Sequence, residues 1–203
     1  MPRRADHDQR RQQIAAALLR IAAARGLHNA GLREVAAEAG VSVRLIQYYF
    51  GTKEQLLLFT TQYLAEQLGE RMRTRIHAAG SPPGPRTVIE AILEAALPDD
   101  EESRVFSVIY ASYAALALTD PGLAMAPLVR SSDVVEKVIA DQLAAGQQAG
   151  QVAAGLDIRT EAVSLLAISA GLSTSVLHNQ RSASEARAIL GYHLDRLFWQ
   201  ARP

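Results

Sequence analysis

The stretch LREVAAEAGVSVRLIQYYFGTKEQL, residues 32–56, constrains the fold most strongly, because two short helical patterns meet there at Gly40. The first pattern, Leu32–Ala39, is only about two turns long, too short to be stable alone in water, so we expect it to pack against neighbours. Its apolar positions share one stripe: Leu32, Val35, Ala36 and Ala39. Gly40 can adopt the left-handed conformation that turns a chain sharply, and Ser42 is well placed to cap a second helix over Val43–Tyr49.

The second helix of this pair has one inward and one outward face. Spacing predicts that Ile46 and Tyr49 point inward. The other face leaves a row for solvent or a partner: Val43, Arg44, Gln47 and Tyr48. A small residue, Ala36, four positions before the turn glycine allows the close approach of a helix-turn-helix. An ordinary corner between two helices uses the same glycine, but it has no need of hydrogen-bonding and aromatic groups on its exposed face.

The charge distribution is uneven along a chain whose formal net charge is zero. The first 60 residues hold nine Arg and Lys against five Asp and Glu, or +4, and the remainder holds 12 against 16, or −4. A basic N-terminal quarter on an acidic body favours a head that binds a polyanion such as DNA. An excess of this size also arises by chance, so the charge supports the helix-turn-helix interpretation without establishing it.

Composition indicates an all-α protein. The 203 residues are 49% hydrophobic, 5% aromatic and 21% charged, and the apolar fraction is mostly Ala and Leu, which favour helices. No unbroken apolar run reaches the roughly 18 residues of a membrane span, and MPRRADHDQRRQQ lacks the apolar segment of a signal peptide. We therefore expect a soluble, cytoplasmic protein that does not contact a membrane. The absence of Cys excludes disulfides and thiolate metal sites.

Helical periodicity continues on both sides of this stretch, with the clearest break at GSPPGP, residues 80–85. An acidic run at residues 99–102 is interpreted as a helix start favoured by the helix dipole, because nothing nearby supplies further metal ligands at fixed spacing. Ser182 and Glu185 have the spacing of a capping box. The predicted helices, besides the central pair, are Asp8–Arg25, Lys53–Ala78, Arg86–Leu97, Glu102–Leu118, one reaching about Gln148, Ile158–Asn179, and a last one from Ser182 to about Ala201.

Residues 14–68 resemble the DNA-binding head of the tetracycline-repressor (TetR) family. The family string of a small residue, Gly, Val and Ser, a short recognition helix, an aromatic pair and Phe, then Lys-Glu-x-Leu, stands here as AGVSVRLIQYYFGTKEQL. The resemblance implies an N-terminal three-helix helix-turn-helix domain, residues 1–52. A long helix would join it to an α-helical ligand-binding and dimerisation domain, residues 53–203. It also implies a homodimeric repressor that binds a palindromic operator in double-stranded DNA and is released from it by a small-molecule effector.

Two departures from the family pattern bear on DNA contacts. Relatives often have Ser or Thr at the start of the second helix, where the hydroxyl caps the helix and touches a phosphate, but this chain has Gly31. Many relatives have Gly and then Tyr within the recognition helix, where this chain has Arg44 and Gln47. We therefore expect this protein to prefer a DNA sequence different from those that its relatives prefer.

The exposed row suggests how DNA would be read. Arg44 is expected to bond a guanine edge, Gln47 an adenine edge, and Val43 to contact a thymine methyl group. Phosphate contacts are expected from Ser42, Tyr48, Tyr49 and Lys53. Lys53 stands at the start of a long helix, where free backbone N–H groups suit an anion, although a simply solvated lysine fits the position as well.

The resemblance also implies an effector cavity and a dimer interface in the body. Residues proposed for the cavity wall are Tyr63, Met72, Phe106, Tyr110, Tyr113, Met125 and Ser169, any of which could instead be core. The scarcity of charge among buried-looking positions suggests a neutral or weakly polar effector. Small residues that permit close helix approach, and an apolar face on the last helix, make up the predicted interface: Ala167, Ala170, Gly171, Leu190, Leu194, Leu197 and Phe198. The alternative is that these positions belong to the core of one chain.

Two other classes of function compete with this interpretation. A helical-bundle enzyme or metal protein requires clustered ligands or an acid–base set, but the five His residues include no Glu-x-x-His pair. The chain also has neither a G-x-S-x-G elbow nor a Gly-rich phosphate loop, so we expect no enzyme activity, metal or cofactor. A ligand-independent DNA-binding protein is harder to exclude, and it would show weak sequence preference and no cavity.

Overall fold

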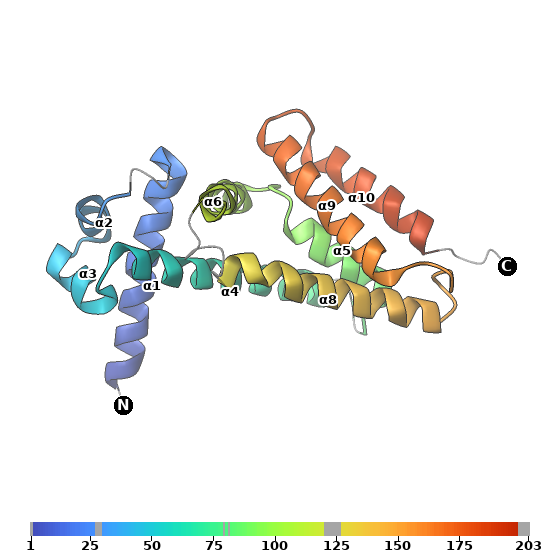
Figure 1. Cartoon of the computed structure of the whole chain (residues 1–203), viewed down its shortest axis with the longest axis horizontal. Coiled ribbons are helices and arrows are strands. Elements are labelled where there is room, and N and C mark those ends of the chain that lie inside the picture. The colour runs from blue at the N-terminus through green and yellow to red at the C-terminus, as the bar shows by residue number, and fades with distance from the viewer. Residues whose placement is uncertain (1, 27–29, 79, 81, 120–126, 199–203) are drawn as a thin grey trace. The chain divides into compact units, whose positions relative to one another are not determined.

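A computed structural model describes residues 2–26, 30–78, 80, 82–119 and 127–198, without the side chains of 2–5, 102 and 127–131. The described residues form nine helices and no strand, with one isolated β-bridge (Figure 1). By packing, the chain divides into two compact units. The first comprises residues 1–67 and 108–130, and the second comprises residues 68–107 and 131–203. The all-α prediction is confirmed.

The first unit contains the predicted helix-turn-helix. Helix α1 (Pro2–Arg25) packs against α2 (Leu32–Ala39), and α2 packs against α3 (Val43–Phe50). Helix α1 ends where Gly26 takes a φ of 82°, as a C-terminal glycine does. The side chains buried between these helices are the apolar ones that the periodicity selected, including Ile14, Leu18, Val35, Ala36 and Ile46.

The turn between α2 and α3 follows from two local interactions. Gly40 has φ 65° and ψ 34°, in the left-handed region, and the N–H of Val41 donates to the carbonyl of Ala36 at 2.9 Å. Ser42 caps α3, because its Oγ accepts a hydrogen bond from the N–H of Leu45 at 3.1 Å. The predicted left-handed conformation of Gly40 and the predicted cap by Ser42 are confirmed.

Helix α4 (Lys53–Ala78) begins in the first unit and ends in the second. Its first half buries Leu56, Leu57, Thr60, Thr61 and Leu64. The two threonine hydroxyls donate to backbone carbonyls of their own helix, which satisfies them inside the core. Packing therefore assigns the start of α4 to the first unit, whereas the predicted functional boundary lies between residues 52 and 53.

The second unit is built from the remaining helices: α5 (Pro85–Ala95), the start of α6 (Glu101–Ala117), most of α8 (Pro127–Gln148), α9 (Ile158–Leu177) and α10 (Ala183–Leu197). Helices α9 and α10 pack on each other and both pack on α5. Their shared core includes Ile89, Leu93, Leu165, Leu172 and Leu190. The capping box at the start of α10 is confirmed, with Ser182 and Glu185 bonded reciprocally.

Helix α9 is strongly apolar, although polar residues interrupt its apolar runs. Its 20 residues include an 18-residue window of mean hydropathy 1.4, long and apolar enough to cross a membrane by length and composition alone. A core helix of a soluble protein passes the same test. Here Ala162, Leu165, Leu172 and Val176 of α9 are buried within the second unit.

Candidate nucleic-acid interface

Helix α3 presents the predicted row of side chains. Arg44 and Gln47 are exposed, Tyr48 is 76% exposed, and Val43 is half-buried. Ile46 on the opposite side is fully buried, so the helix cannot rotate without uncovering its apolar anchor. An exposed row that combines a guanidinium, an amide and a phenol on a short, capped helix is chemically suited to base edges and phosphates.

Aromatic rings hold the C-terminal end of α3 against the rest of the unit. Tyr49 is half-buried, and its ring centroid lies 5.3 Å from that of Tyr48 in an edge-on arrangement. Phe50 is buried, with its centroid 5.4 Å from that of Phe59 on α4. The guanidinium carbon of Arg11 on α1 lies 4.2 Å from the centroid of Phe59 and 5.2 Å from that of Phe50. Sequence analysis missed Arg11, because a stacked arginine leaves no signal in the spacing.

The start of α4 carries the second group of predicted phosphate contacts. Thr52 caps this helix, and its Oγ1 accepts from the N–H of Gln55 at 3.2 Å. Lys53 is half-buried, with no ion pair among those found in the described residues. Hydrogen bonds from its own backbone N–H and from Thr52 lower the pKa of Glu54, so this carboxylate stays charged at the helix start. A phosphate approaching Lys53 would therefore also meet the negative charge of Glu54.

The departure at Gly31 has a structural counterpart. Gly31 is the N-cap of α2, and no side chain caps that helix end. The carboxylate of Glu34 folds back to where a Cβ at position 31 would lie. This helix end therefore presents an acid at the place where the family pattern led us to expect a hydroxyl.

The predicted interface residues separate into two groups. Ala167, Ala170 and Gly171 are exposed on α9, and Leu197 is half-buried on α10. Leu190, Leu194 and Phe198 are 1%, 0% and 5% exposed and lie in the second unit's own core, which favours the alternative that they are core positions of one chain. The apolar face of α10 was correctly recognised, but it packs on helices of the same chain.

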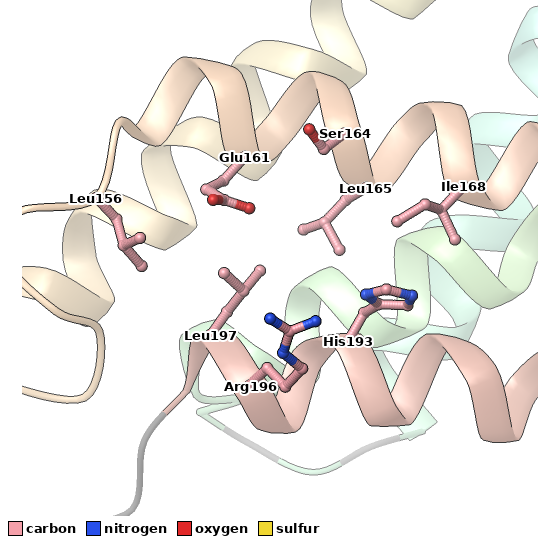
Figure 2. A pocket seen from close by; sticks show the side chains of 8 residues that line it. All are labelled: Leu156, Glu161, Ser164, Leu165, Ile168, His193, Arg196 and Leu197. Atoms are coloured by element: carbon pink, nitrogen blue, oxygen red, sulfur yellow. The ribbon is translucent and has the colours of Figure 1, made fainter.

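Two shallow grooves run along the exposed side of α9 and α10. The smaller, of about 200 Å³, lies where Glu161 and Leu165 project from α9 and His193, Arg196 and Leu197 project from α10 (Figure 2). The larger, of about 480 Å³, is lined by residues that include Ala167, Gly171 and Ile189. Tyr192 and Val163, which are 60% and 46% exposed, stand on the same two helices. Tyr192 was missed, although its position midway between Leu190 and Leu194 already placed it on the opposite side of α10.

The residues predicted for an effector cavity divide between the two units. Tyr63, Tyr110 and Tyr113 belong to the first unit, Met72, Phe106 and Ser169 belong to the second, and Met125 lies outside the described residues. The hydroxyl of Tyr113 donates to the carbonyl of Leu57 at 3.2 Å, and burial raises the pKa of Tyr113. The hydroxyl of Ser169 donates to the carbonyl of Leu93 at 3.2 Å. These two hydroxyls are already satisfied by the backbone, and the cavity itself stays a prediction.

A charged cluster that sequence analysis missed surrounds Asp99 in the second unit. Its side chain is 10% exposed and accepts from Arg71 and Arg75 of α4, each at 2.6 Å, and from Arg187 of α10. Asp100 caps α6: hydrogen bonds from the backbone and side chain of Ser103 lower its pKa to about 2. The acidic run thus starts a helix as predicted. Asp99 also forms ion pairs with residues of other helices, up to 88 residues away in the sequence. Among the described residues, no group of three or more His, Cys, Asp or Glu is placed to hold a metal.

This protein combines a capped helix-turn-helix that has an exposed polar row with a second helical unit. That combination is typical of DNA-binding regulators. Comparison with known proteins agrees. Residues 14–58 match the family described as bacterial regulatory proteins, tetR family, and residues 85–198 match the C-terminal region of the BetI-type transcriptional repressor. The second match covers more than half of the chain. The protein belongs to the TetR family of transcriptional regulators, with a C-terminal region of BetI type.

Individual relatives support this assignment. The chain is 38% identical over 73 residues to the regulator PksA of Bacillus subtilis, covering 36% of each protein. It is 32% identical over 114 residues to the regulator BetI of Serratia proteamaculans, covering 56% of this chain and 57% of BetI. A TetR-family regulator of Rhodococcus sp. has the same fold, with a TM-score of 0.81 and 26% identity over 94% of this chain and 99% of that one. A regulator of Saccharomonospora viridis, solved with choline, has a TM-score of 0.84 and 23% identity over 95% and 100% of the two chains.

Proposed function

We propose that the protein is a homodimeric repressor that binds a palindromic operator through α3. A small-molecule effector releases this repressor from the operator. The observation that carries this proposal is the row Arg44, Gln47 and Tyr48, exposed on a helix whose opposite side is anchored by buried Ile46. A helix presented in this way can enter the major groove, where each base pair displays a distinct set of hydrogen-bonding groups. Two such helices related by a two-fold axis would read two half-sites about one helical turn apart.

The exposed side of α9 and α10 supports the dimer. Ala167, Ala170 and Gly171 leave α9 without bulky side chains there, and a Cβ added at Gly171 would meet nothing within 4 Å. The neighbouring Tyr192 and Val163 expose apolar surface that a partner subunit would cover. The smaller groove is below the roughly 300–1,000 Å³ of ligand pockets, so a partner's side chain suits it better than a drug-sized molecule.

A charge introduced into this face tests the dimer. Gly171→Glu should give a monomer by sedimentation with unchanged helicity, because the position is open in the single chain. Ala154→Glu, at an exposed position of the loop before α9, is the matched control and should leave the dimer intact. A Gly171→Glu protein that sediments as a dimer would rule out this face.

Selection of DNA from a random pool by the purified protein tests the operator. A palindromic consensus with half-sites about 10 base pairs apart is the expected result. Enrichment of no sequence, despite retention of DNA, would instead indicate the competing ligand-independent DNA-binding protein. The two outcomes are separable in one experiment, because selection reports sequence preference and retention reports affinity.

The effector is proposed as a small molecule whose binding weakens operator affinity by about 5–150-fold, the usual range of allosteric coupling. The C-terminal match is to BetI-type repressors, and the Saccharomonospora viridis neighbour was solved with choline. Tyr63 and Tyr110 are half-buried aromatic residues of a kind that binds quaternary ammonium groups through their ring faces. Choline is therefore the first compound to titrate into the operator complex, beside an uncharged isostere. Release by the isostere alone would favour the neutral effector that the sequence suggested.

A further inference from the structure

A histidine of α1 lies beside the tyrosines of the recognition helix. The ring centroid of His7 is 4.7 Å from that of Tyr49, in an edge-on arrangement with an interplanar angle of 64°. The ring of Tyr49 in turn meets that of Tyr48, with centroids 5.3 Å apart. These three side chains, His7, Tyr49 and Tyr48, form an aromatic row that leads from α1 to the exposed tip of α3. Sequence analysis assigned phosphate contacts to the two tyrosines and no role to His7.

The position of His7 is set by the packing of α1 on the rest of the unit. One turn further along α1, Arg11 stacks on Phe59 and Phe50. Gln13 donates from Nε2 to the carbonyl of Ala39 at the end of α2, at 3.0 Å. These contacts join α1 to α2, α3 and α4, so the imidazole is held next to the recognition helix.

The imidazole is accessible, and charged residues flank it along α1 in the sequence: Arg3, Arg4, Asp6, Asp8, Arg10 and Arg11. The His7 side chain is 44% exposed, and its Nδ1 lies 3.9 Å from a carboxylate oxygen of Asp8. From α3, the group packed against it is the phenol ring of Tyr49, which in turn contacts the ring of Tyr48. From α1, Arg11 lies one turn away with its charge placed over aromatic rings. A ring nitrogen of His7 is therefore free to donate to a phosphate oxygen close to the one that Tyr48 or Tyr49 would contact.

We propose that His7 is a further DNA-phosphate contact, which is charged only when protonated and makes operator affinity increase as the pH falls from about 8 to about 6. This inference rests on the proposed DNA-binding role of α3. Imidazole is the side chain that changes charge in this pH range, and a phosphate at hydrogen-bond distance stabilises its protonated form. DNA binding would then take up a proton at each head. The contribution is present at low pH and is lost as the pH rises.

The experiment measures operator affinity of the full chain against pH. The probe is the palindrome obtained by selection, labelled for fluorescence anisotropy, in buffers of pH 6.0 to 8.0 at constant ionic strength. Each proton taken up changes operator affinity by at most tenfold per pH unit. We therefore expect the operator affinity of the wild type to be at least about tenfold higher at pH 6 than at pH 8. At pH 6 the dependence on salt should also be steeper, by about one unit per added phosphate contact.

Two variants separate charge from packing. His7→Phe keeps a ring against Tyr49 but removes the charge and the N–H donor, so its affinity should lie at or slightly below that of the wild type at pH 8 and should not rise at pH 6. His7→Lys keeps a positive charge throughout and should bind tightly at both pH values. His77→Phe, which alters an exposed imidazole at the end of α4 in the second unit, is the matched control and should retain the wild-type pH profile. Circular dichroism of each variant confirms that it folds.

The outcomes distinguish this inference from the proposed function. If His7→Phe shows the same pH profile as the wild type while both bind the palindrome selectively, the role of His7 is wrong and the DNA-binding function stands. If the wild type enriches no sequence at any pH, the proposed sequence-specific operator recognition fails first. A His7→Phe protein that is equally weakened at every pH would show that His7 only packs against Tyr49, which also overturns the inference.

Discussion

The ring of Phe198 occupies the space that a side chain at Gly146 would need. A Cβ added to Gly146 would lie 2.9 Å from Cε1 of Phe198 and 2.9 Å from Cγ2 of Val152. Val152 and Phe198 also form the isolated β-bridge, so the end of α10 is secured to the chain just after α8 at this point. The glycine is therefore explained by close approach between segments far apart in the sequence.

Substitution of this glycine should destabilise the protein. In Gly146→Ala the new methyl group must displace Phe198 or Val152, and overpacking of this kind costs about 1–3 kcal/mol. Alanine also favours the helix by about 1 kcal/mol, so we expect a net loss of up to about 2 kcal/mol in urea unfolding. Gly69→Ala is the matched control, because a Cβ there meets only the flexible Arg73, at 3.5 Å, and the helix gains stability. Equal gains from both substitutions would show that the Phe198 contact is not tight.

Base readout by α3 predicts a specific loss on Arg44→Ala. Removal of a guanidinium that bonds one base edge should weaken operator binding by about 1–3 kcal/mol and relax preference at a single position of each half-site. Binding to a panel of single-base operator variants measures both effects. Arg73→Ala, which removes an exposed arginine of the second unit, should leave affinity and preference unchanged. Unaltered discrimination by the Arg44 variant would remove Arg44 from the base contacts.

A phosphate contact at the start of α4 predicts a different pattern for Lys53→Ala. Affinity should fall alike for all sequences, and the slope of log K against log salt should become shallower by about one per head. Salt titrations with the operator and with an unrelated duplex measure this. Lys137→Ala provides a lysine control on α8, where Lys137 is paired with Asp141. A loss confined to the operator would assign Lys53 to base readout instead.

The cluster around Asp99 predicts acid sensitivity of the second unit. Burial raises the pKa of Asp99, but the hydrogen bonds and charges of Arg75, Arg187 and Arg71 outweigh it, and the net pKa is lowered. A folded-state pKa below the unfolded value near 3.9 means that this stabilisation is complete above about pH 4 and is lost as the pH falls through the folded pKa. Urea unfolding at pH 7 and below pH 4 should show this loss.

Asp99→Asn should remove the part of the acid-induced loss of stability that the protonation of Asp99 causes. At pH 7 the variant leaves three arginines around a neutral amide and should cost about 2–3 kcal/mol, less than the 3–5 kcal/mol of a fully buried pair. Asp141→Asn, which breaks an exposed pair with Lys137, should cost under about 1 kcal/mol. A neutral effect of Asp99→Asn would mean that solvent already screens the cluster.

The sequence alone determined the parts of this protein that depend on neighbours in the chain. Gly40 and Ser42 act through bonds within five residues of themselves, so their φ angle and cap could be predicted from residue type. The same holds for the capping box at Ser182 and for the exposed row on α3, because helical spacing dictates which side chains oppose the buried Ile46.

What each apolar face packs against depends on contacts between helices that are distant in the sequence. Spacing showed that Leu190 and Leu194 lie on one side of a helix, but periodicity cannot tell whether a partner subunit or the same chain covers that side. The ion pairs of Asp99 with Arg71 and Arg187 span 28 and 88 residues, the stacking of Arg11 on Phe59 joins two helices, and Gly146 is required by Phe198. No local pattern encodes such distances, because these contacts form only when separate helices pack together.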